Sequence, residues 1–85
     1  MSEIFEHTLD ERGHLCPLPV IALGHLWARL QGESGTHIIT VVADDPVAVI
    51  DIPAWCNMKN AVLLSVTKSV DPTQPETREF RITQS

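Results

Sequence analysis

The residue best suited to chemistry in this chain is Cys16, which opens the tetrapeptide Cys16-Pro17-Leu18-Pro19 ahead of an apolar helical run. Pro17 disfavours helical dihedrals in the residue before it and fits the first position of a helix, so we expect Cys16 at the helix N-cap. The free end of a helix favours an anion such as a thiolate, through its unpaired N–H groups and its macrodipole. Leu18 and Val20 would be the donors, because the two prolines have no N–H. We therefore expect a reactive thiol whose pKa is lower than the ordinary value of about 8.5.

The second cysteine, Cys56, lies beside Trp55 in an apolar stretch, where a buried structural thiol is the expected role. It could instead resolve a persulfide formed on Cys16. A dithiol redox protein would use both cysteines and form a stable intramolecular disulfide, which the absence of a CxxC motif disfavours. A non-catalytic adaptor, in which Cys16 is structural and buried, is the other alternative.

Histidine and aspartate side chains are the remaining candidates for a site. The four histidines have neither i, i+4 nor clustered spacing, and His14 with Cys16 supplies at most two ligands, so we expect no metal site. Three acids look like catalytic carboxylates, yet each precedes a proline or a predicted helix start: Asp44, Asp45 and Asp51. We expect them to cap helices by accepting backbone N–H bonds.

Two long motifs surround these residues. The first is Leu9-Asp10-x-Arg12-Gly13-x-Leu15 followed by Cys-Pro-x-Pro, and the second is Asp44-Asp45-Pro46-x-Ala48-x-x-Asp51-Ile52-Pro53-x-Trp55-Cys56. Their order, spacing and flanking hydrophobic residues closely resemble the TusA-like sulfur carrier family, and the resemblance extends from about residue 9 to residue 82. It implies that Cys16 carries sulfur as a persulfide and that no cofactor takes part.

The same resemblance implies partners for Cys16. Donors would be a cysteine desulfurase or a rhodanese-like sulfurtransferase, and the acceptor a DsrE-like protein. Family members supply sulfur to tRNA thiolation, to cofactor assembly or to sulfur oxidation, and the sequence leaves these pathways open. We expect the chain to act as a monomer.

The periodicity of apolar residues predicts the elements that would position Cys16. A partly alternating strand is expected over residues 4–10, an amphipathic helix over 17–30, and a strand rich in β-branched residues, either buried between layers or central in a sheet, over 37–43. The family resemblance implies a second helix, whose regular part we expect over residues 51–60 because Pro53 would interrupt a longer one.

Two strands complete the chain, over residues 61–70 and 77–83, joined by the turn-rich segment 71–76. The order βαβαββ predicts an α+β fold, a two-layer sandwich with two helices on one face of a mixed four-stranded sheet. The length of 85 residues allows one domain, residues 1–85.

The composition of the chain indicates its cellular compartment and the class of molecule that it binds. The chain has no apolar stretch near the roughly 18 residues that a membrane span needs, and its acidic N-terminus is unlike a signal peptide. We therefore expect a cytoplasmic protein, where a reducing environment suits a working thiol. The net charge of -5 and the scattered basic residues argue against direct binding of nucleic acid and favour protein partners.

Overall fold

The computed structural model describes residues 3–84 of the chain. In order these form strand β1 (Ile4–Asp10), helix α1 (Leu18–Leu30), strand β2 (Thr36–Ala43), helix α2 (Ala48–Lys59), strand β3 (Ala61–Asp71) and strand β4 (Gln74–Gln84). The predicted βαβαββ order is confirmed. Neither helix is long and apolar enough to cross a membrane, and no other helix occurs within residues 3–84.

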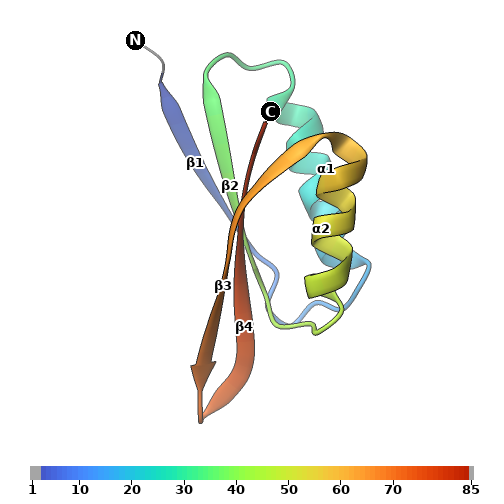
Figure 1. The fold of residues 1–85 in the computed structure, drawn as a ribbon, viewed down its shortest axis with the longest axis vertical. Coiled ribbons are helices and arrows are strands. Elements are labelled where there is room, and N and C mark those ends of the chain that lie inside the picture. The colour runs from blue at the N-terminus through green and yellow to red at the C-terminus, as the bar shows by residue number, and fades with distance from the viewer. Residues whose placement is uncertain (1–2, 85) are drawn as a thin grey trace.

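The four strands form one mixed sheet in the order β1-β2-β4-β3. Strands β1 and β2 are parallel, whereas β4 is antiparallel to both of its neighbours, β2 and β3. Both helices cover the same face of this sheet, and the β3–β4 hairpin extends beyond them (Figure 1). The predicted two-layer α+β sandwich is confirmed, with β2 central as expected.

The core lies between this sheet and the helices. On β2, alternate residues face the helices, so that Ile39 lies opposite Ile82 and Val41 opposite Phe80. Leu23 of α1 and Ile52 of α2 are fully buried against them. The rings of Trp27 and Trp55 join the two helices edge to face, with centroids 5.4 Å apart. The alternating apolar residues of the strands thus pack against the apolar residues spaced three or four apart in the helices, and together they form one apolar layer.

Helix α1 begins at Leu18, one residue later than expected, with Pro17 at the N-cap and Pro19 in the first turn. Cys16 therefore precedes the N-cap and belongs to the loop. The Cys16–Pro17 peptide bond is cis. The buried residues of α1 include Leu23, Leu26 and Leu30, as the amphipathic pattern predicted.

Helix α2 begins earlier than expected, at Ala48, and contains Pro53 without a restart at Asp51. The N–H that Pro53 lacks would have bonded to the carbonyl of Val49, a residue that is 40% exposed. The loss of one bond is therefore compatible with a continuous helix. Asn60 ends the helix in the left-handed conformation, with φ 57°, which asparagine tolerates better than most residues.

The connection between β3 and β4 is shorter than the predicted turn over residues 71–76. Strand β3 runs to residue 71 and β4 starts at residue 74, so only Pro72 and Thr73 lie between them. The turn-forming residues that flank this pair continue the hairpin ladder, because pairing with the neighbouring strand outweighs their local preference.

The orientation of α2 can be tested with two substitutions in this helix, one at a buried position and one at an exposed position. Ile52→Ala removes a fully buried side chain and should lower the free energy of unfolding by about 2–5 kcal/mol. Ile50→Ala is the matched control, because Ile50 is 68% exposed and its loss should change stability by only about 0.5 kcal/mol. Urea denaturation measures both, and equal losses would contradict the orientation of α2.

Candidate functional site

Two loops meet at one edge of the sheet. One, residues 11–17, follows β1, and the other, residues 44–47, follows β2. Because β1 and β2 are parallel, both loops leave the sheet at the same end (Figure 1). The Glu11 N–H donates to the Val42 carbonyl at 2.8 Å, which holds the first loop beside β2 as it leaves the sheet. The two sequence motifs are thereby adjacent in space.

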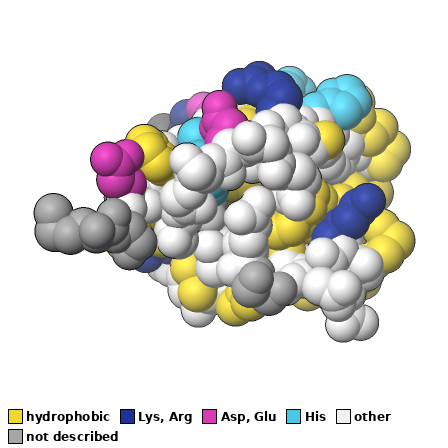
Figure 2. Space-filling view, turned by 90° about the horizontal axis from the view of Figure 1, so that it is seen from above, with side chains coloured by type: hydrophobic (Ala, Val, Ile, Leu, Met, Phe, Trp, Pro, Cys, Tyr) yellow, Lys and Arg dark blue, Asp and Glu magenta, His cyan; other side chains and the backbone are white. Residues whose placement is uncertain are grey.

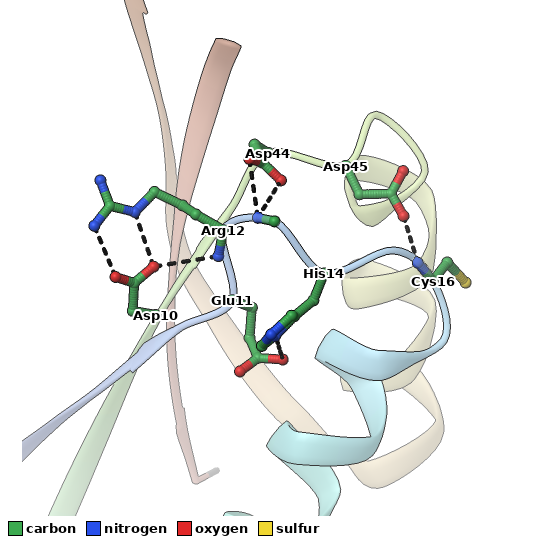
Figure 3. Close-up of polar contacts among 8 residues, drawn as sticks. Asp10, Glu11, Arg12, His14, Cys16, Asp44 and Asp45 are labelled. Carbon is green, nitrogen blue, oxygen red and sulfur yellow. Dashed lines mark hydrogen bonds and ion pairs between the residues drawn. The ribbon is translucent and has the colours of Figure 1, made fainter. Parts of the chain in front are cut away.

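Aspartates of the second loop bind the backbone of the first. The Gly13 N–H donates to both carboxylate oxygens of Asp44 at 3.0 Å, and the Cys16 N–H donates to Asp45 Oδ2 at 2.6 Å (Figure 3). Asp45 is only 7% exposed, and its other oxygen accepts the Val47 N–H at 3.0 Å. A buried carboxylate therefore fixes the main chain of Cys16 relative to the start of α2.

The thiol of Cys16 is exposed, and its sulfur points away from the Asp45 carboxylate (Figure 3). It donates a hydrogen bond to Oδ2 of Asp51, which lies in the first turn of α2. The two sequence motifs thus meet at a single residue, Cys16. Asp45 accepts its backbone N–H, and Asp51 accepts the hydrogen bond from its thiol.

This arrangement corrects the expected acidity of the thiol. The hydrogen bond to Asp51, then desolvation, then the negative charges of Asp51 and Asp45 raise the pKa of Cys16. The Leu18 N–H, expected to stabilise a thiolate, donates instead to the Leu15 carbonyl at 2.9 Å. The predicted lowering of the pKa is wrong, because it counted the helix end and missed the acids contributed by another part of the chain.

The expected capping role of the aspartates is also corrected. Helix α2 has Val47 at its N-cap and no side-chain cap bond, so Asp44 and Asp51 cap nothing there. Asp45 alone accepts a nearby backbone N–H, that of Val47, through Oδ1, and its Oδ2 accepts the Cys16 N–H. The signal that local reasoning missed is topological: Asp44 and Asp45 directly follow a strand whose parallel neighbour ends beside it.

An apolar groove adjoins the thiol. A cavity of about 250 Å³ lies between α1 and α2, lined by Pro17, Val20, Asp51, Ala54, Trp55 and Met58. Further apolar side chains are exposed in the surrounding segments, from 44% for Val47 to 69% for Leu15, and they include Leu18, Ile21 and Ile50. Loss of water from apolar surface favours association, so this end of the molecule is suited to contact another protein.

The other cysteine has the opposite environment. Cys56 is 2% exposed, and burial raises its pKa to about 11, which confirms the expected buried thiol. Both cysteines are free, and no disulfide joins them. The adaptor alternative required a buried Cys16, and the exposure of Cys16 contradicts that requirement.

Histidine placement differs from the expectation in one respect. His7 and His37, far apart in sequence, meet through the β1–β2 pairing, with His7 Nε2 3.0 Å from His37 Nδ1. His14 Nδ1 lies 3.2 Å from Glu11 Oε1, so its described side-chain partner is Glu11. Within residues 3–84, no three His, Cys, Asp or Glu side chains converge as metal ligands would.

The raised pKa of Cys16 predicts how alkylation depends on pH. In a Cys56→Ser variant, the rate of reaction with iodoacetamide should reach its midpoint above the free-cysteine pKa of about 8.5, since the thiolate forms only above the folded pKa. In a Cys16→Ser variant, the buried Cys56 should react only when the protein unfolds. A midpoint for Cys16 at or below the free value would contradict the role of Asp51.

Comparison with known proteins agrees with this geometry. In the solved structures, the SirA-like protein from Desulfitobacterium hafniense is similar with a TM-score of 0.68 and 22% identity, covering 91% of this chain and 95% of that chain. At this identity the likeness shows the shared fold alone. The family model described as sulfurtransferase TusA matches residues 7–83, which include both loops and both helices of the site. The chain belongs to the TusA sulfurtransferase family.

Proposed function

We propose that this protein is a sulfur carrier in which Cys16 accepts sulfane sulfur as a persulfide and relays it to an acceptor cysteine. The observation that carries the proposal is the contrast between the two thiols. Cys16 is exposed on a loop whose backbone is held by a buried carboxylate, whereas Cys56 is 2% exposed. Membership of the TusA family supports the class of chemistry.

The transfer is a thiol exchange that balances without a cofactor. The Cys16 sulfur attacks the terminal sulfur of a donor persulfide R–S–SH, which forms the new S–S bond and breaks the donor's S–S bond. The leaving thiolate takes up the proton that Cys16 loses, so that Cys16–SH and R–S–SH become Cys16–S–SH and R–SH. Exchange of this kind depends on access to the attacking sulfur, which the exposed loop supplies.

The proposed partners are proteins. A cysteine desulfurase or a rhodanese-like protein would donate, a DsrE-like protein would accept, and both would dock on the loop 12–18 and the start of α1. The exposed apolar side chains around Cys16 support this surface. At the opposite end of the molecule, Lys and Arg side chains stand apart instead of forming a basic patch (Figure 2). We place the carrier in the cytoplasm, serving tRNA thiolation, cofactor assembly or sulfur oxidation.

Loading should depend on one cysteine only. Incubation with a cysteine desulfurase and its cysteine substrate should add the mass of one sulfur atom to the wild-type protein and to Cys56→Ser, measured on the intact protein. Cys16→Ser should gain none. Circular dichroism of both variants controls for folding, and equal loading of the two would remove Cys16 from the proposed role.

Docking near the loop can be tested by two matched charge reversals. Arg12 and Lys68 have side chains 53% and 54% exposed, and each forms an exposed ion pair, with Asp10 and Glu76 respectively. Arg12→Glu should slow sulfur transfer from the donor protein by about tenfold, through slower association. Lys68→Glu, on strand β3 and outside the Cys16 loop, should leave the rate unchanged. If both reversals slow transfer equally while melting temperatures stay constant, the proposed surface is wrong.

A further inference from the structure

The hydrogen bond between Asp51 and the Cys16 sulfur is unusual for a thiol that must exchange. A nearby cation or a free helix end would promote the thiolate, whereas a carboxylate disfavours it. We propose that Asp51 is a positioning residue that keeps the carried sulfur as a neutral hydropersulfide, Cys16–S–SH, so that the loaded protein gives sulfur to thiolate acceptors. This inference rests on the proposed function of Cys16.

The geometry restricts where the carried sulfur can lie. Asp45 Oδ2 fixes the Cys16 N–H at 2.6 Å, and Asp51 Oδ2 accepts the bond from the thiol. Asp51 belongs to a regular helix and lines the apolar groove together with Pro17. The carboxylate is therefore carried by a helix, beside the groove, and not by a loop.

The charges that face Cys16 are both negative. They are Asp51 on α2 and Asp45 after β2. On the Cys16 loop, Arg12 is ion-paired with Asp10 at 2.7 Å, and His14 Nδ1 lies 3.2 Å from Glu11 Oε1. The first turn of α1 has no charged side chain, and within residues 3–84 the side chains that form hydrogen bonds with Cys16 are the carboxylates of Asp45 and Asp51. Nothing among these contacts compensates an anion at this sulfur.

Adding a second sulfur extends the side chain by one S–S bond, about 2.05 Å, and rotation of the Cys16 side chain can turn the terminal S–H toward the same carboxylate. A carboxylate oxygen can accept a hydrogen bond from S–H and repels S⁻. The contact that now holds the thiol would therefore hold the terminal S–H of the hydropersulfide and disfavour its ionisation.

Protonation decides which acceptors the loaded carrier can serve. A persulfide anion is a nucleophile and suits an electrophilic acceptor such as an activated carbon. A neutral hydropersulfide lacks the charge that would repel an incoming thiolate A–S⁻. That thiolate attacks the terminal sulfur and the Cys16 S–S bond breaks, while its electron pair stays on Cys16 and takes up the proton that the acceptor lost. The reaction A–SH + Cys16–S–SH → A–S–SH + Cys16–SH balances, and its acceptor is a cysteine.

The test uses the full chain loaded with inorganic tetrasulfide, with loading verified by intact mass. In Asp51→Asn, the pKa of the loaded sulfur, read from the pH profile of alkylation by iodoacetamide, should fall by about one unit, a roughly tenfold rise in anion below that pKa. Transfer of sulfur to 2-mercaptoethanol at neutral pH should fall. If Asp51 acted only by repelling the incoming thiolate, Asp51→Asn would instead make the transfer to 2-mercaptoethanol faster.

Two variants control this comparison. Glu79→Gln removes one negative charge from an exposed position on β4 and should behave as wild type. Asp51→Glu keeps the carboxylate and should restore both readouts toward wild type. An unchanged alkylation profile in Asp51→Asn, or thiolate transfer as fast as in wild type, would overturn the inference. A wild-type protein that gains no sulfur on Cys16 would overturn the proposed function itself.

Discussion

The parallel pairing of β1 with β2 is the constraint on which the site depends. Parallel strands need a crossover helix between them, and their carboxyl ends meet at one edge of the sheet. Helix α1 is that crossover, and the loop that precedes it carries Cys16. The loop after β2 ends beside it, so Asp45 can reach the Cys16 N–H and anchor Cys16 to the other half of the chain.

The same topology explains how Cys16, whose thiol is exposed, can form hydrogen bonds to two carboxylates, those of Asp45 and Asp51. Both helices pack on one face of the sheet, and α2 is fixed by buried residues such as Ile52 and Trp55. Asp51 lies between these anchors and the loop, so the apolar packing of α2 determines where its carboxylate lies. Core packing therefore positions a group that acts on the surface. This arrangement suits a carrier, because the Cys16 sulfur stays accessible while the carboxylate that accepts its hydrogen bond is held in place by the core.

The electrostatic character of the site differs from that of cysteines activated by a cation. Two carboxylates face Cys16 and raise its pKa, so the resting residue is a protonated thiol at neutral pH. A protonated thiol reacts slowly with oxidants and alkylating agents, which spares a carrier from side reactions between encounters. Under the proposed function, fast exchange then depends on a protein partner whose docking would bring a persulfide or a thiolate to the exposed sulfur.

The sequence alone determined the element order, the class of fold and the identity of the exposed and buried thiols, because these follow from periodicity, from proline and glycine positions and from two long motifs. Tertiary structure decided the roles of Asp44, Asp45 and Asp51. Local reasoning assigned them to helix caps, yet they also bind Gly13 and Cys16, which lie 29 to 35 residues away along the chain. The pKa of a thiol depends on every charge that the fold brings near it, and spacing along the chain does not report those distances.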